Sequence, residues 1–307
     1  MSIVDKDDQI QRLLLGEGSV RAQMVTLTRS WREILKRHDL PAVLIAELGR
    51  LSAAGVLLAA ALKFEGSLVL QIHGDGPVKL MVVESSANGE FRATAKLSEG
   101  AVLQDGDSLD VLVNSEGKGR FVVTLDPGPT AENRQTYQGI VSLDAGAVAL
   151  MLESYMQRSE QIPTRIWLSA NRERACGLLL QKLPGDGGIH SASDNDAWDR
   201  LVLLADTVTE RELLSLTPEA LLHRLFWQEK IQTSETRSCR FACSCTREKV
   251  ASMLRMLGRR EVEEILAERA DVEVHCDFCN QRYAFDAIDS AQLFTDTAPA
   301  PESDLRH

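Results

Sequence analysis

Four cysteines near the C-terminal end of the chain have the residue type and the spacing of a metal site. Cys243 and Cys245 form a C-x-C pair, Cys276 and Cys279 form a C-x2-C pair, and 30 residues separate the two pairs. Four thiolates suit tetrahedral Zn2+, with Zn–S bonds of about 2.3 Å. The pairs can converge if the chain between them folds back, so we predict a four-cysteine zinc site. Unrelated free thiols and an iron–sulfur cluster are the alternatives.

Three further residues are candidates for the same chemistry, and a simpler role is favoured for each. Cys239 lies four residues before Cys243 and could be an alternate ligand or a disulfide partner, but four ligands already satisfy the metal. His275 could replace a thiolate, although a fourth cysteine is available. Cys176 precedes an apolar run, so we expect a small buried hydrophobe there.

Zinc-bound thiolates are also the form of cysteine that oxidants attack. Two cysteines within a few residues of each other can convert a sulfenic acid into a local disulfide. A disulfide cannot act as a thiolate ligand, so zinc would leave. An isolated domain of about 60 residues holds only ~3–9 kcal/mol of stability, whereas structural zinc contributes about 10–16 kcal/mol. Loss of the metal is therefore expected to unfold this region.

The elements that must position these cysteines differ along the chain. Residues 1–184 predict an α+β domain with a mostly antiparallel sheet. A short strand leads, helices follow to about residue 64, and 41–64 has an almost continuous apolar helical pattern. The predicted strands are 67–73, 78–84, 90–96, 109–113, 120–125 and 137–143, and 147–158 is predicted to be a helix.

Residues 185–238 predict an acidic helical linker, with 5 basic and 10 acidic residues. Trp198, Leu201, Val202 and Ala205 have helical spacing. A capping box is expected at 209–212, and Thr217-Pro218 predicts another helix start. Short helices are marginal alone in water, so these need a surface on which to lie.

Residues 239–295 predict a small α+β domain that carries the four cysteines. One helix ends at Gly258, a second contains Val262, and two short strands at 272–276 and 282–285 flank the C-x2-C pair. Residues 296–307 are predicted to be a disordered tail.

Composition argues against several classes of function. The formal net charge is -11 and aromatic residues make up 5% of the chain, which disfavours a general nucleic-acid binder. The N-terminus lacks the pattern of a secretory signal. The longest apolar run, 51–62, is shorter than the roughly 20 residues of a membrane span, so we expect a core helix and a cytosolic protein without a membrane partner. No catalytic constellation stands out, so an enzyme is not expected.

Several segments, taken together, are highly specific to one family. They are Leu62-Lys63-Phe64-Glu65-Gly66, Gln71-Ile72-His73-Gly74-Asp75-Gly76-Pro77, Tyr137-Gln138-Gly139-Ile140-Val141, Glu153-Ser154-Tyr155, Ser159-Glu160-Gln161-Ile162-Pro163-Thr164, Gly177-Leu178-Leu179-Leu180-Gln181 and Tyr283-Ala284-Phe285-Asp286. With these segments and the paired cysteines, the chain resembles the redox-regulated heat-shock chaperones, the 33-kDa chaperonin family, over nearly its full length.

The resemblance implies an ATP-independent holdase of the cytosol. In the reduced, largely inactive form, Cys243, Cys245, Cys276 and Cys279 would hold one Zn2+. On oxidation, Cys243 would pair with Cys245 and Cys276 with Cys279, zinc would leave, and the linker would lose stability. Exposed apolar surface, in residues 1–184, would then bind unfolding client proteins, often as a homodimer.

Three alternatives stay open on the residues alone. The apolar stripe of the linker is either ordinary core or the cover of a client-binding surface, and the resemblance favours the second. A zinc-ribbon module for nucleic acid is opposed by 9 basic against 13 acidic residues in 239–307. A thiol oxidoreductase with Cys276 and Cys279 as its dithiol would need a neighbouring βαβ pattern, which the predicted helices and hairpin do not provide.

Overall fold

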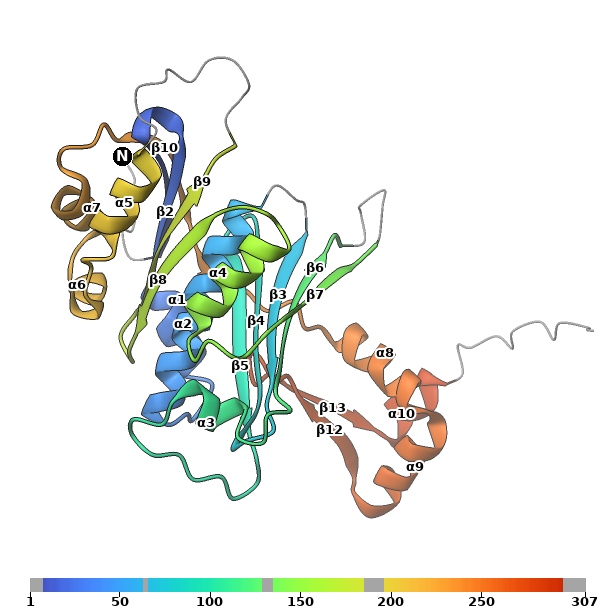
Figure 1. Ribbon diagram of the computed structural model, residues 1–307. Coiled ribbons are helices and arrows are strands. Elements are labelled where there is room, and N and C mark those ends of the chain that lie inside the picture. The colour runs from blue at the N-terminus through green and yellow to red at the C-terminus, as the bar shows by residue number, and fades with distance from the viewer. Residues whose placement is uncertain (1–7, 63–65, 129–134, 185–195, 295–307) are drawn as a thin grey trace, which may run out of the picture. The chain divides into compact units, whose positions relative to one another are not determined.

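A computed structural model describes residues 8–62, 66–128, 135–184 and 196–294. It divides the chain into two compact units, Met1–Ala242 and Cys243–His307. The first unit contains two antiparallel-rich sheets with a long helix between them (Figure 1). The predicted α+β class is therefore confirmed.

One sheet of the first unit has five strands in the order β10-β1-β2-β9-β8, and all of its neighbours are antiparallel. Its strands are β1 Gln9–Leu15, β2 Val20–Leu27, β8 Thr164–Ala170, β9 Ala175–Lys182 and β10 Gln232–Ser238, with a short 3-10 turn at Gly16–Gly18. The other sheet has six strands in the order β11-β5-β4-β3-β6-β7. Its strands are β3 Ser67–His73, β4 Val78–Ser86, β5 Glu90–Leu97, β6 Arg120–Asp126, β7 Tyr137–Val141 and β11 Arg240–Phe241.

Helix α2, Ala42–Ala61, forms the centre of the first unit because both sheets pack against it. Its residues are apolar on almost every side, as expected for a helix that is buried all round. It is long and apolar enough to cross a membrane by length and composition, but 72% of that stretch is buried inside the protein. The expectation of a core helix in the apolar run is therefore confirmed. Helix α4, Val148–Arg158, packs against α2 and β8, and helix α1, Arg29–Leu35, contacts β5 and β11.

Two sequence expectations for this unit were wrong. Residues 109–113 form helix α3, Leu109–Val113, and not a strand. The Ser108 hydroxyl accepts a hydrogen bond from the Val111 N–H at 3.4 Å, which caps the helix. Five apolar residues are too few to separate a period of 2 from one of 3.6. Strand β2 lies in a region expected to be helical, because a central strand buried on both faces has no alternation.

Strands β8 and β9 were not predicted either. All but the last residue of β9 are buried, so this strand carries no period-2 signal. The two strands complete the five-stranded sheet and give it two apolar faces. One face contacts α2, and the opposite face belongs to a second hydrophobic cluster.

Three short helices cover that second face. They are α5 Ala197–Ala205, α6 Glu210–Ser215 and α7 Pro218–Phe226, and all lie in the predicted linker. Leu201, Leu213 and Phe226 are buried there with Met24 and Leu178 of the sheet. Figure 1 shows the three helices beside β2, β8 and β9. The capping box is present, since Thr209 and Glu212 exchange hydrogen bonds, and Thr217 caps α7. The predicted boundary after residue 184 adjoins residues outside those described.

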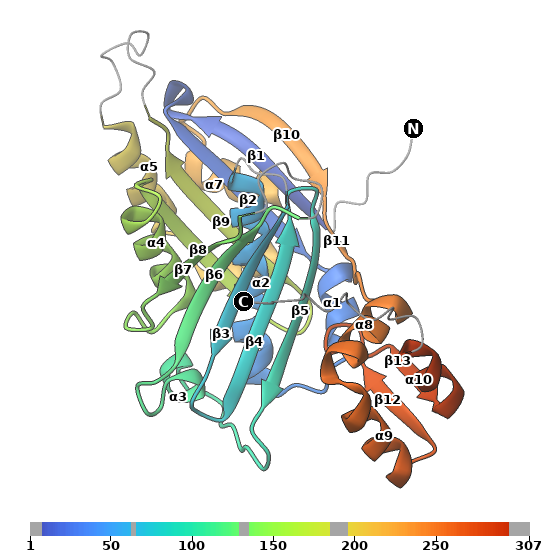
Figure 2. The same cartoon turned by 90° about the vertical axis from the view of Figure 1, so that its right-hand side faces the viewer.

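The last seven residues of the predicted helical linker form strand β10. Together with β11 they make an extended stretch, Gln232–Phe241, that we call the edge segment. It adds β10 antiparallel to β1 at one border of the first sheet, then adds β11 parallel to β5 at one border of the second (Figure 2). Cys239, between the two strands, is 5% exposed and packs into the main core of the unit.

Gly89 permits the close passage of the edge segment. It lies at the β4–β5 turn with φ 86°, and a Cβ there would meet the Ser238 carbonyl oxygen at 2.4 Å. Gly117 has a similar φ, 73°, with nothing within 4 Å of the corresponding position. Substitution by alanine would strain the backbone at both glycines, but only at Gly89 would the added Cβ collide with the edge segment.

We predict that Gly89→Ala loosens the edge segment and exposes Cys239 in the reduced protein. Burial, with a further effect of Asp8, raises the pKa of Cys239 to about 12 from 9.0. A released thiol should therefore react with an alkylating agent at pH 8 up to about a thousandfold faster, because the thiolate is the nucleophile. Peptide mapping after pulsed alkylation measures this, with Gly117→Ala as the control. Equal rates in the two variants would contradict the assignment.

Candidate metal centre

The second unit is a β-hairpin surrounded by three helices. Its elements are α8 Arg247–Leu257, α9 Arg259–Glu268, β12 Asp271–His275, β13 Arg282–Asp286 and α10 Ala287–Leu293. Both predicted helices and both strands are present, and α8 ends at Gly258 with φ 105°. Helix α10 was not predicted; Asp286 and Asp289 form its capping box. Residues 296–307, the predicted disordered tail, lie outside the described residues.

The C-x-C pair lies immediately before the start of α8. Thr246 follows Cys245 directly and caps the helix, with its hydroxyl accepting a hydrogen bond from the Lys249 N–H at 3.3 Å. The cap fixes the point at which extended chain becomes helix. Cys243 and Cys245 are therefore held on a short extended stretch whose end is anchored.

The C-x2-C pair occupies the turn of the β12–β13 hairpin, as predicted. The Cys276 N–H donates to the Gln281 carbonyl at 3.0 Å, and the Asn280 N–H donates to the Cys276 carbonyl at 2.8 Å. Asn280 has φ 57°, a left-handed conformation that asparagine tolerates better than most residues. The turn places both cysteines on the same side of the hairpin end.

The structure brings the four predicted cysteines together. Their Sγ atoms all lie within 4.8 Å of one another. Two of these distances are 3.6 Å between Cys243 and Cys276 and 3.3 Å between Cys245 and Cys279. Four sulfurs at about 2.3 Å around one tetrahedral ion are about 3.8 Å apart. The donor set and its dimensions are thus consistent with one ion, and four thiolates favour zinc. A cluster of several irons needs more widely separated sulfurs.

Tyr283 is a neighbour of the cluster whose role sequence reasoning missed. Its hydroxyl lies 3.2 Å from the Cys245 sulfur and donates a hydrogen bond to it. This hydrogen bond is the main reason why the pKa of Tyr283 rises to about 12. Hydrogen bonds to ligand atoms orient them and tune their basicity. A sequence signal for this contact was available. The predicted hairpin pairs Tyr283 with Val274, two residues before Cys276, which places Tyr283 near the cysteine turn.

Burial is the largest influence on the Cys279 thiol and raises its pKa, and hydrogen bonds from the other three cysteines raise it further. In the absence of a cation the protonated thiol is therefore the favoured form of Cys279. A divalent cation reverses that preference, because it binds the thiolate and displaces the proton.

The other candidates lie outside the cluster. Cys239 belongs to the core of the first unit, as described above. His275 is half exposed, and its Nε2 lies 3.9 Å from a Glu273 carboxylate oxygen. Cys176 is 2% exposed on β9, and burial raises the pKa of its thiol to about 11. The expectation of a small buried hydrophobe at Cys176 is confirmed.

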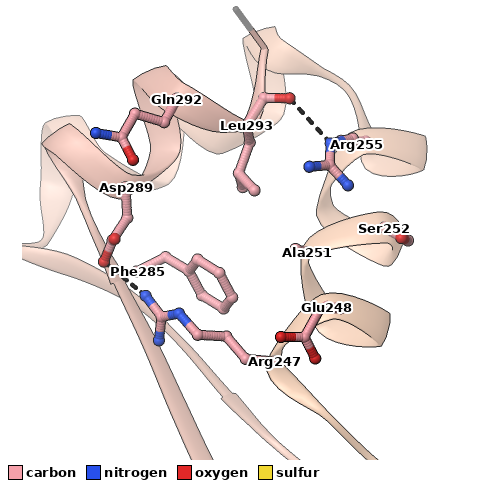
Figure 3. Close-up of a pocket in the computed structure, with 9 residues that line it drawn as sticks. All are labelled: Arg247, Glu248, Ala251, Ser252, Arg255, Phe285, Asp289, Gln292 and Leu293. Atoms are coloured by element: carbon pink, nitrogen blue, oxygen red, sulfur yellow. Dashed lines mark hydrogen bonds and ion pairs between the residues drawn. The ribbon is translucent and has the colours of Figure 1, made fainter. Parts of the chain in front are cut away.

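The second unit has a small apolar core and an open hollow beside it. The core consists of seven buried residues: Val250, Ala251, Leu254, Val262, Val272, Phe285 and Leu293. In Figure 3, Arg247 extends across the hollow, with its guanidinium carbon 4.1 Å from the centre of the Phe285 ring and an ion pair of 2.7 Å to Asp289. Arg255 donates to the Leu293 carbonyl at 3.0 Å. The hollow measures about 330 Å³ and is open to solvent.

Comparison with known proteins agrees with these features. The model of the family "Hsp33 protein" matches residues 8–286. The 33 kDa chaperonin of Methylobacillus flagellatus is 46% identical over 98% of this chain and 99% of its own length. That of Chromobacterium violaceum is 44% identical over 98% of each. In structure, the 33 kDa chaperonin (heat shock protein 33 homolog) of Thermotoga maritima has a TM-score of 0.75 at 22% identity, covering 93% of this chain and 97% of that one, which supports the fold.

The same comparisons decide between the classes of function that the cysteines allowed. The βαβ context of a dithiol oxidoreductase is absent around Cys276 and Cys279, which lie at a hairpin turn between described strands. The full-length relatives are chaperonins. The chain therefore belongs to the Hsp33 family of 33 kDa chaperonins, which are chaperones and not enzymes.

Proposed function

We propose that this chaperone is an ATP-independent holdase whose activity is controlled by oxidation of its four-cysteine cluster. The single observation that carries the proposal is the convergence of four Sγ atoms within 4.8 Å in a unit with a small core. The reduced, metal-bound form is inactive. The oxidised, metal-free form binds unfolding proteins and prevents their aggregation under oxidative stress in the cytoplasm.

Cys243, Cys245, Cys276 and Cys279 would hold one Zn2+ per chain. Zinc supplies a non-redox cation that neutralises and links four thiolates. The protein supplies the α8 cap, the hairpin turn and the Tyr283 hydroxyl that orient the sulfurs. A unit of about 60 residues has ~3–9 kcal/mol of its own stability, and structural zinc adds about 10–16 kcal/mol. The metal is therefore the larger contribution to the folding of this unit.

The oxidation step balances with a peroxide as the oxidant. A thiolate attacks the peroxide, the O–O bond breaks, and a sulfenic acid and hydroxide form. A second thiol attacks the sulfenic sulfur, so that an S–S bond forms and water leaves. Each disulfide consumes one peroxide and two thiols, and two disulfides leave no thiolate for the metal. Hypochlorous acid can replace the peroxide, with chloride as the leaving group.

The proposed disulfides are Cys243–Cys245 and Cys276–Cys279, as the family resemblance implies. Two sulfur–sulfur contacts in the structure join members of different pairs, Cys243 with Cys276 and Cys245 with Cys279. Those distances follow from four sulfurs sharing one centre. Once the unit opens, the local pairs remain close in sequence while the others separate, and this supports the local pairing.

Residues 185–238 are proposed to act as the linker that transmits the change. Its helices α5, α6 and α7 are six to nine residues long, which is too short for stability in water. They are held by burial of an apolar face on the five-stranded sheet and by contacts such as Asp206 with Arg165 at 2.9 Å and with the Trp167 indole N–H at 3.1 Å. Exposed ion pairs add little. Release of the helices would uncover the apolar face for clients, and a homodimer would form in the oxidised state.

We predict that the anaerobically purified protein contains about one zinc per chain and six free thiols. Peroxide with mild heat should release the zinc and consume the four clustered thiols first, while Cys176 and Cys239 are still buried. Suppression of the aggregation of a thermally unfolding test protein should rise in parallel. If the oxidised, zinc-free protein protects the test protein no better than the reduced form, the switch is wrong.

Cys276→Ser should abolish tight zinc binding and make the last ~65 residues protease-sensitive even in reductant, because metal binding and folding of this unit are one process. Limited proteolysis followed by mass spectrometry measures the effect. Ser244→Ala, an exposed change between two ligands, is the control and should remain protected. A protected C-terminal unit in Cys276→Ser would refute the coupling.

Thr209→Ala should destabilise α6 by about 1 kcal/mol, because it removes the cap that accepts from the Glu212 N–H. The amides of residues 213–216 should then exchange about fivefold faster. Oxidised protein should also become active at a lower temperature. Thr209→Ser, which retains the acceptor oxygen, should behave as the parent. Equal exchange in both variants would show that the cap does not stabilise the linker.

A further inference from the structure

The edge segment, Gln232–Phe241, is attached mainly through its backbone. Strand β10 pairs with β1 from Gln9↔Ser238 to Leu14↔Gln232, with one register shift at Arg12/Leu13. The sequence of β10 is QTSETRS and contains no aliphatic or aromatic residue. Because its pairing does not depend on apolar side chains, the border of β1 accepts an extended chain with little regard to sequence.

The side chains that anchor the edge segment are mostly polar. They include an ion pair of Arg240 with Glu90 on β5 and a contact of 3.8 Å between Glu235 and Arg12 on β1. Cys239 is buried, and Phe241 packs partly into the core beneath Arg37, whose guanidinium carbon is 4.7 Å from the ring centre. Arg237 donates to the Ala87 carbonyl at 2.9 Å. Strand β11 has only two residues, with the Arg240 N–H donating to Gly89 and the Ala242 N–H to Phe91 at 3.0 Å each. Such a short attachment depends on the chain being held at both ends.

One end of the edge segment leads directly into the four-cysteine cluster. A single residue, Ala242, separates β11 from Cys243. The other end continues from α7 of the linker. Tethering at both ends keeps the effective concentration of the edge segment high at its own border, and loss of either anchor lowers it. Opening of the second unit and the linker would therefore favour departure of the edge segment.

Departure of the edge segment would leave β1 and β5 as border strands of the two sheets. Strand β10 is the end strand of its sheet and lies next to β1, and β11 is the end strand of the other sheet and lies next to β5. Unpaired N–H and C=O groups would then lie next to apolar side chains that are buried while the edge segment is in place, including Ile10 at 4% and Phe91 at 1% exposure. An open strand border beside apolar surface is a template for pairing with another extended chain.

We propose that the borders of β1 and β5 vacated by the edge segment are a docking site at which an extended segment of an unfolding client adds as a strand. The proposal rests on the proposed function but concerns a surface separate from the face under α5–α7. Unfolding proteins share exposed backbone in extended stretches as well as exposed apolar side chains, and the pairing of the polar β10 with β1 shows that this border takes an extended backbone. That match favours a client over a second copy of the chain as the occupant.

The first test places a photo-cross-linking amino acid at Gln11, in the middle of the β1 border and only half-buried. The probe is a thermally unfolding test protein mixed with full-length reduced or oxidised chaperone. Cross-links from Gln11 to the test protein should be absent in the reduced form and appear after oxidation. Gln11 lies on the same face of β1 as Leu13, so these cross-links place the client at β1, and the peptides below distinguish pairing at the border from binding on the apolar face. The same amino acid at Gln138, exposed on the border strand β7, is the control and should not gain cross-links on oxidation.

The second test uses synthetic peptides of residues 232–241 with Cys239→Ser. The unmodified peptide should displace the test protein from the oxidised chaperone and reduce its protection against aggregation. A peptide with the same side chains but with alternate backbone amides methylated cannot form the ladder and should be inert. This pair separates backbone pairing from side-chain binding.

The outcomes distinguish this proposal from the proposed function. Oxidised protein that protects the test protein, with no cross-links from Gln11 or with two equally active peptides, overturns the docking site and leaves the holdase intact. If Gln11 cross-links only to a second copy of the chain, the occupant of the border is that copy and not a client, and the proposal is wrong. Oxidised protein that protects nothing refutes the holdase itself.

Discussion

Four sulfur atoms within 4.8 Å of one another are the constraint on which the second unit depends. Thiolates at this distance repel each other unless a cation lies among them, and protonated thiols give only weak contacts. The surrounding core is small, and an open hollow lies beside Phe285 and Leu293. The fold of this unit is therefore conditional on the chemistry of its cysteines. Under the proposed function, a change in sulfur oxidation state would become a change in folding, because the apolar core of this unit is small.

The first unit has the opposite character. Its main core fills the space between two sheets around α2. Its covering elements are weaker than its core. Short helices cover one sheet face, and the polar edge segment covers two strand borders. Stability is thus graded along the chain, with the marginal parts placed between the stable core and the conditional unit, where a local opening can spread to them.

If the proposed function holds, this grading explains how the chaperone is kept inactive without a catalytic step. The surfaces suited to unfolded chains are apolar area and free strand borders, and in the resting molecule the chain itself occupies both. Cys176 and Cys239 illustrate the difference between the two kinds of thiol. Burial keeps their pKa values high, at about 11 and about 12, so they are poor targets for oxidants, whereas the clustered cysteines are only half-buried.

The sequence by itself was enough to predict the four-cysteine site and most of the helices, caps and turns. The four cysteines, the hairpin turn at Cys276–Cys279, the caps at Thr209 and Thr217 and the buried helix α2 were all predicted, because their signals are short-range patterns of residue type and spacing. Family membership followed from motifs spread along the chain. These features need no knowledge of distant contacts.

Only the tertiary structure decided which residues are neighbours across the fold. Strands β2 and β9 lack alternation because most of their residues are buried on both faces, and α3 was too short for its period to be read. The polar strand β10 has no apolar pattern at all, since its partner β1 supplies the ladder. Tyr283 reaches Cys245 across 38 positions of the chain. Burial on two faces, backbone pairing and long-range side-chain contacts are properties of the assembled fold, and a linear pattern does not record them.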